Sequence, residues 1–224
     1  MNLLHLDPPL WLALSSWLIM IAAIAYAVRE VRPAFLPNSA AQHAWLAAIV
    51  TVCLMWAMHV RSPIGLDFGL VGSALFTLVF GRARAMLGLL AALALYTVLE
   101  SGSWLGFGIN AVIMALIPAW LASALQTLVV QRLPRNLFVF IIGNGLFVTL
   151  LTTASTNLLI LALGALETTA RGALFGDHVA YALLLAWGEA LLSGMLFSAL
   201  VIFRPQAVLT YPVDLYLPPR KPVH

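Results

Sequence analysis

The chain of 224 residues is 63% hydrophobic and only 8% charged, about a third of the charged fraction usual in soluble domains. A soluble enzyme is therefore excluded. A nucleic-acid-binding protein is excluded as well, because the basic residues are scattered singly or in pairs between apolar runs and form no patch. The single cysteine, Cys53, lies inside such a run, so there is no disulfide framework and no CxxC motif. We expect one integral membrane domain over residues 1–224.

Long apolar runs follow one another along the chain. Each is expected to form a transmembrane helix, because backbone polar groups in lipid must be hydrogen-bonded within the segment. The predicted fold is an all-α polytopic membrane protein with about seven transmembrane helices, over residues 10–28, 42–58, 68–81, 83–99, 105–130, 136–166 and 178–203. The third run, of about fourteen residues, is short for a span, and the sixth, of about thirty, is expected to tilt, break or contain a re-entrant piece.

The basic residues predict the orientation, since Lys and Arg are retained on the cytoplasmic side. With the N-terminus outside, only Arg61 and Arg171 fall on the outer side, so an odd number of spans and a cytoplasmic C-terminus are expected. Basic residues follow the first run instead of preceding it, which disfavours a cleaved signal peptide. The cleavage-like sequence at 25–27 leaves processing as an alternative. The Pro-rich tail from about residue 205 is expected to lie irregularly on the cytoplasmic surface.

Histidines and acidic residues gather at the predicted outer helix ends. Imidazole and carboxylate groups bind borderline divalent transition metals such as cobalt, nickel, copper and zinc. An outer vestibule that collects cations is therefore a hypothesis, and its candidate ligands are His5, Asp7, His59, Asp67 and His178. The alternative for each histidine is a simple position at the membrane interface.

Glu189 is predicted to lie inside the membrane. It is about eleven residues into the last run, roughly 16 Å deep. An isolated carboxylate at that depth costs several kcal/mol, so such residues usually face a cavity, a partner or a substrate pathway. The alternatives are a protonated side chain or a structural hydrogen bond, with Asn110 and Asn144 as candidate partners.

Hydroxyl and amide side chains are dense in the sixth run, between Asn144 and Asn157. Such groups either line a polar cavity or hold neighbouring helices together, and the second use is the more common in membrane proteins. Small residues such as Ala23, Ala27 and Gly108 permit close helix packing, although their spacing is frequent in any membrane helix.

The motifs of several enzyme classes are absent from the sequence. It contains no P-loop, GxSxG, HExxH or paired intramembrane aspartates. We therefore expect the protein not to be an enzyme. If it moves a substrate uphill, the energy must come from a gradient or from a partner subunit.

Three segments form a pattern: LDFGLVGSALFTLVFG at 66–81, GINAVIMA at 108–115, and an ending with His178, Gly188-Glu189 and Arg204-Pro205. Together they resemble the CbiM/NikM family, the membrane substrate-binding components of cobalt and nickel transporters of the energy-coupling-factor type. The resemblance covers about residues 60–210. The sequence RPQAVLT at 204–210 is similar to the ending of a divergent proteobacterial branch.

Two positions depart from the family pattern. Metal-binding members begin Met-His and use that histidine as a ligand, whereas this chain begins Met1-Asn2. Members also have a histidine three residues before the glycine corresponding to Gly72, and Gly69 stands there instead. His5, His59 and Asp67 are candidates to replace these ligands.

The resemblance implies a mechanism and partners. The component would bind cobalt or nickel from outside, associate with a transmembrane coupling subunit and cytoplasmic ATPase subunits in the bacterial inner membrane, and release the metal inward. It implies no covalently bound cofactor, and lipid and these subunits as partners, without nucleic acid.

Two alternatives remain at this level. The same architecture could bind a small organic nutrient or a metal chelate, in a pocket built from Trp11, Trp17, Trp56, Trp104 and Phe107. It could also be an accessory assembly protein without a substrate, in which Glu189 and the threonines only hold helices together.

Overall fold

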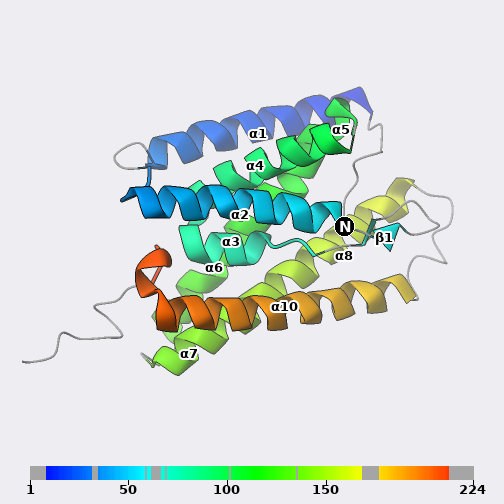
Figure 1. Cartoon of the computed structure of the whole chain (residues 1–224). Helices are drawn as coiled ribbons and strands as arrows, with labels where there is room; N and C mark the ends of the chain where they lie inside the picture. Colours follow the sequence, from blue (N-terminus) through cyan, green and yellow to red (C-terminus); the bar gives the residue numbers. More distant parts are fainter. Residues whose placement is uncertain are drawn as a thin grey trace, which may run out of the picture.

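The fold is a helical bundle. The computed structural model describes residues 9–31, 35–58, 60–61, 67–68, 70–100, 102–134, 136–167 and 177–211. The long helical stretches run side by side, with α1 and α10 along opposite edges (Figure 1). In chain order the elements are α1 (Leu10–Val31), α2 (Ser39–Ala57), β1 (Val60–Arg61), β2 (Asp67–Phe68), α3 (Ser73–Phe80), α4 (Arg82–Leu99), α5 (Trp104–Asn110), η1 (Ala111–Leu116), α6 (Ile117–Arg132), α7 (Leu137–Ile141), η2 (Ile142–Val148), α8 (Thr149–Glu167), α10 (Asp177–Phe203) and η3 (Pro205–Ala207).

Within the described residues, six helical stretches are long and apolar enough to cross a membrane. They are α1, α2, α4, α10 and two composite helices, α5–η1–α6 and α7–η2–α8. The most buried are α4 and α5–η1–α6, whereas α1 and α2 expose most of their apolar surface. A membrane supplies the apolar surroundings that such exposed surface needs. The predicted all-α polytopic membrane fold is confirmed.

The third predicted run is only partly helical. Of residues 68–81, α3 takes Ser73–Phe80, and β2 pairs antiparallel with β1 just before it. At 1.5 Å per residue an eight-residue helix is about 12 Å long, far less than the roughly 30 Å of a bilayer core. The described part of this run is therefore a non-helical stretch at 70–72 followed by a short helix, and Figure 1 shows α3 between α2 and α10.

The sixth predicted run is one helical stretch on an oblique path (Figure 1), so of the three expectations for it tilt fits the structure, whereas a break and a re-entrant piece do not. The helix is longer than an upright span needs. The extra residues are accommodated by a π-helical segment, η2, between α7 and α8, and by the oblique path of the helix across the bundle (Figure 1). A second π segment, η1, lies within the preceding helix. A π turn holds an extra residue, so it changes which side chains face the core before and after it.

The end of α10 is followed by a packed segment. Val208 and Tyr211 are buried, and the Leu209 N–H donates to the Val79 carbonyl at 2.8 Å. The amide of Gln126 donates to Thr210 at 2.9 Å. The beginning of the tail, expected to lie irregularly on the surface, therefore packs against α3 and α6 as far as Tyr211.

The arginines of the long helices that the structure describes lie at one end of the bundle. The C-terminal ends of α1, α6 and α10 and the start of α4 meet there (Figure 1). At that end Arg82 pairs with Glu30 at 3.0 Å, and its guanidinium lies 4.1 Å from the centre of the Trp120 ring. By the positive-inside rule this end is predicted to be cytoplasmic.

This orientation can be tested with single cysteines in a Cys53→Ala background. Gly102→Cys lies between α4 and α5, at the predicted outer end, and Gln131→Cys lies in the last turn of α6, at the basic end. We expect a membrane-impermeant maleimide to label the first variant in intact cells and the second only after permeabilisation. The reverse pattern would contradict the predicted orientation.

A second prediction concerns helix packing. A Cβ added at Gly108 of α5 would lie 2.7 Å from the Ser16 hydroxyl and 2.9 Å from the Trp17 backbone nitrogen, whereas a Cβ at Gly188 would meet nothing within 4 Å. Gly108→Ala must push α5 away from α1, at a cost of about 1–3 kcal/mol. We expect a lower melting temperature in detergent for Gly108→Ala than for Gly188→Ala, which serves as the matched control. Equal melting temperatures would contradict this packing.

Candidate functional site

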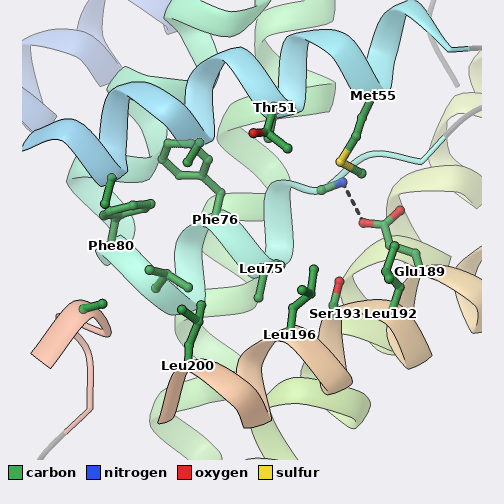
Figure 2. A pocket seen from close by; sticks show the side chains of 16 residues that line it. Thr51, Met55, Leu75, Phe76, Phe80, Glu189, Leu192, Ser193, Leu196 and Leu200 are labelled. Atoms are coloured by element: carbon green, nitrogen blue, oxygen red, sulfur yellow. Dashed lines mark hydrogen bonds between the residues drawn. The ribbon is translucent and has the colours of Figure 1, made fainter. Parts of the chain in front are cut away.

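A buried carboxylate holds the beginning of α3. Glu189 of α10 accepts two hydrogen bonds, from the Val71 N–H at 2.8 Å and from the Gly72 N–H at 2.7 Å, one on each carboxylate oxygen. Its side chain is 1% exposed. Figure 2 shows the carboxylate pointing from α10 across to the segment that leads into α3. The prediction that Glu189 is buried is confirmed, but it bonds to backbone N–H groups and not to Asn110 or Asn144.

The local backbone explains why the carboxyl group of Glu189 finds hydrogen-bond donors here. The first N–H groups of a helix have no carbonyl partner within it, and the helix dipole favours negative charge at that end. Gly72 adopts a left-handed conformation, with φ of 69°, immediately before α3. That conformation strains residues with a side chain but not glycine.

The same backbone segment is held from the opposite side by α2. The indole N–H of Trp56 donates to the Val71 carbonyl at 2.8 Å. Trp56 is buried, and its ring meets Tyr96 of α4 nearly edge-on, with 6.0 Å between ring centres. Val71 and Gly72 thus form a bridge between α2 and α10, which we call the Val71–Gly72 bridge.

A groove of about 310 Å³ lies between α2 and α10, with α3 as its floor. Its lining is almost entirely apolar, with side chains such as Met55, Phe76 and Leu196 (Figure 2). Glu189 lines the groove beside Ser193. The groove is therefore suited to hydrocarbon and unsuited to a hydrated ion along most of its length.

Six polar side chains of the sixth run are buried inside the bundle, whereas Ser155 is exposed. Asn144, Thr149, Thr152, Thr153, Thr156 and Asn157 are each at most 2% exposed. The amide of Asn157 donates to the Ala182 carbonyl of α10 at 3.1 Å, which joins the two helices directly. This contact supports the helix-joining interpretation. The Asn144 amide donates within its own helix, to Phe140, as does the Asn110 amide to Gly106.

The structure describes few of the predicted metal ligands. His5, Asp7 and His59 lie outside the described residues, and Asp67 is described only as backbone in β2. His178 lies in the first turn of α10, half-buried. In the part of the chain that the structure describes, no three His, Cys, Asp or Glu side chains gather closely enough to hold a metal ion.

The tryptophans predicted for an organic pocket do not form one site. Phe107 packs against Trp17 and Trp104, with ring centres 5.6 and 5.4 Å away. Trp56 belongs to the Val71–Gly72 bridge, and Trp11 is 70% exposed. The arrangement fits helix packing and surface anchoring better than a ligand pocket.

The sequence profile of the CbiM family, described as cobalt uptake substrate-specific transmembrane region, matches residues 6–207. The chain belongs to the CbiM family. This match covers nearly the whole chain, including α10 with Glu189 and the β1–α3 segment.

Solved structures show the same fold for this CbiM-family chain. A crystal structure of a truncated transition metal transporter superposes with a TM-score of 0.76 at 16% identity, covering 91% of this chain and 99% of that one. A crystal structure of a transition metal transporter superposes with a TM-score of 0.74 at 17% identity, covering 96% of each. No curated protein sequence matches the chain.

Sequence reasoning missed the backbone partners of Glu189 and the role of Trp56 in the CbiM-family chain. The sequence did contain two indications of the backbone partners. A carboxylate predicted at mid-membrane needs hydrogen-bond donors, and Gly72 marks a place where a helix could be interrupted. The periodicity of the apolar residues gives no such indication, since the segment is apolar on both sides of Gly72.

The bridge predicts the effect of Trp56→Phe. The substitution leaves the Val71 carbonyl buried without its donor, at a cost of about 1–3 kcal/mol. We expect a lower melting temperature in detergent than for Trp187→Phe, whose tryptophan is 50% exposed on α10. If the two variants have the same melting temperature, the indole hydrogen bond of Trp56 contributes nothing to stability.

Proposed function

We propose that this chain is the membrane-embedded substrate-binding component of a transporter that imports a divalent transition metal, cobalt or nickel. The observation that carries the proposal is the match to a cobalt uptake family over residues 6–207. The superposed structures are described as transition metal transporters, and that supports the same class of cargo. Under this proposal the chain binds and releases a metal ion and catalyses no reaction.

We propose that the metal site is at the end of the bundle opposite the basic end. His178, in the first turn of α10, and the strands β1 and β2 lie at that end (Figure 1). The proposed ligand set is His5, Asp7, His59, Asp67 and His178, which combines imidazole and carboxylate donors suited to borderline divalent metals. This end is the one predicted to face outward.

Energy for import is proposed to come from other proteins. The chain has no nucleotide-binding motif, so the proposal includes a transmembrane coupling subunit and cytoplasmic ATPase subunits, in a bacterial inner membrane. The basic end of the bundle would then face the ATPases, and lipid would surround the exposed apolar helix faces.

The metal proposal is tested by elemental analysis. The protein is purified in mild detergent without a chelator or a metal-affinity tag, as wild type and as the His59→Ala, Asp67→Ala and His43→Ala variants. We expect about one equivalent of cobalt or nickel in the wild type and its loss in the first two variants, because a lost ligand weakens a site of few donors. His43→Ala is the matched control, since His43 is an exposed residue in the second turn of α2, near the opposite end of the bundle.

The wild-type result decides between functions. Wild-type protein without metal, even after incubation with cobalt or nickel salts, would contradict the proposal. Wild-type protein with metal that is retained in both His59→Ala and Asp67→Ala would leave metal binding standing and remove these two residues from the site.

A further inference from the structure

The groove between α2 and α10 has the length of one leaflet of a bilayer. Its wall on α2 extends from Ala44 to Met55, and its wall on α10 extends from Glu189 to Leu200. Each wall therefore rises by roughly 16 Å along its helix, and half of a hydrocarbon core about 30 Å thick is about 15 Å. Ala44 lies near the start of α2 and Leu200 near the end of α10, so the groove leads from the middle of the membrane to its surface at the basic end of the bundle.

The groove is a narrow slot. The wall on α2 includes the small residues Ala44 and Ala48, whereas α10 contributes the larger Leu192, Leu196 and Leu200. The enclosed volume is about 310 Å³. A helix 16 Å long and about 10 Å across would occupy roughly 1,200 Å³, so a helix does not fit into the slot. An acyl chain, which is only one methylene group wide, does fit.

Two polar side chains of the lining are already hydrogen-bonded within the protein. Both carboxylate oxygens of Glu189 accept N–H groups of the Val71–Gly72 bridge, and the Thr51 hydroxyl donates to the Ala47 carbonyl at 2.8 Å. Neither needs a partner from a ligand, and apart from Ser193 the rest of the lining is apolar. Hydrocarbon is thus an occupant that the deep end of the groove accepts without loss of a hydrogen bond.

A cation lies where the groove reaches the membrane surface. The Arg204 N–H donates to the Leu200 carbonyl at 2.8 Å, and the Arg204 carbonyl accepts from the Ala207 N–H at 2.8 Å. Leu200 and Ala207 both line the groove, and the Arg204 side chain between them is exposed. In the described part of the chain no carboxylate forms an ion pair with Arg204. A guanidinium group in this position is suited to a phosphate, which it can bind through two parallel hydrogen bonds.

From this geometry we propose that the groove is a binding site for one anionic phospholipid, with an acyl chain between α2 and α10 and the headgroup phosphate on Arg204. The lipid belongs to the leaflet at the basic end, and anionic lipids of the cytoplasmic leaflet are attracted to basic residues near the surface. Walls from two helices, a floor from α3 and a cation at one end distinguish this site from the lipid that surrounds any membrane protein. The inference does not depend on the metal proposal.

The headgroup contact is tested by native mass spectrometry of the whole chain in detergent, which gives the dissociation constant of the first lipid bound. The two probes are dioleoylphosphatidylglycerol, which is anionic, and dioleoylphosphatidylcholine, which has the same chains and no net charge. The variants are Arg204→Gln and its matched control Arg29→Gln. Arg29 is an exposed arginine in the last turn of α1, at the same end of the bundle but on the opposite edge from α10 (Figure 1).

We expect the wild type to bind the phosphatidylglycerol about 5-fold more tightly than the phosphatidylcholine, because one arginine near the surface contributes about that factor. Arg204→Gln should remove this preference, and Arg29→Gln should keep it. Equal binding of the two lipids by the wild type would overturn the inference. A preference that survives in Arg204→Gln would overturn it as well.

The acyl-chain contact is tested with Ala48→Phe, which fills the slot. The matched control is Ala47→Phe, because Ala47 is the exposed neighbour on α2 and lies outside the lining. We expect Ala48→Phe to weaken the binding of both lipids and Ala47→Phe to weaken neither. Equal affinities in the two variants would overturn the inference, and so would a transmembrane partner protein that is lost in Ala48→Phe while lipid binding is unchanged.

The melting temperature in lipid-free detergent shows whether each variant is folded. If Ala48→Phe does not fold, Ala44→Phe takes its place, since Ala44 lines the groove from an exposed position in the second turn of α2. The inference then requires weaker binding of both lipids in Ala44→Phe than in Ala47→Phe. Equal binding in this pair would overturn it.

Discussion

The interior of a bilayer offers no water to a backbone that leaves helical conformation, and this constraint governs the centre of the molecule. The chain is non-helical just before α3, so the polar groups of Val71 and Gly72 need partners from elsewhere in the protein. Glu189 supplies acceptors for both N–H groups, and Trp56 supplies a donor for the Val71 carbonyl. A carboxyl group that would be costly to bury if isolated thus supplies the acceptors that a non-helical segment inside the bundle needs.

The packing of the surrounding helices follows from the same constraint. α10 must approach the beginning of α3 closely enough for the Glu189 carboxyl group to reach it, and a pair of glycines lets α10 pack closely on η2. Gly194 of α10 meets Gly145 of η2 so closely that a Cβ on Gly145 would lie 3.1 Å from the Gly194 Cα. Asn157 adds a hydrogen bond between α8 and α10, the kind of contact that holds helices together in membranes. Close packing and buried polar groups act together to hold α10 in place.

Much of the fold could be predicted from the sequence, because apolar runs long enough to span a bilayer are a strong local signal. The all-helical membrane fold and the burial of Glu189 followed from that signal. The sequence could not reveal that the run at 68–81 divides at Gly72, since hydropathy is the same on both sides. It also could not reveal the π segments, in which one added residue per turn is set by packing against neighbours and not by the local sequence.

The candidate site was less predictable for a physical reason. Glu189 is bound by backbone N–H groups, and backbone groups are present at every position, so no side-chain pattern marks them. Trp56 likewise looks like any aromatic residue near a span end. The metal ligands, by contrast, were proposed from residue type and from the family resemblance, and they remain a prediction.

The groove between α2 and α10 also affects how the bundle can deform. The Val71–Gly72 bridge crosses this groove near one end and is hydrogen-bonded to both of the helices that form its walls. Any widening of the groove at that end must therefore lengthen the hydrogen bonds of Glu189 or of Trp56.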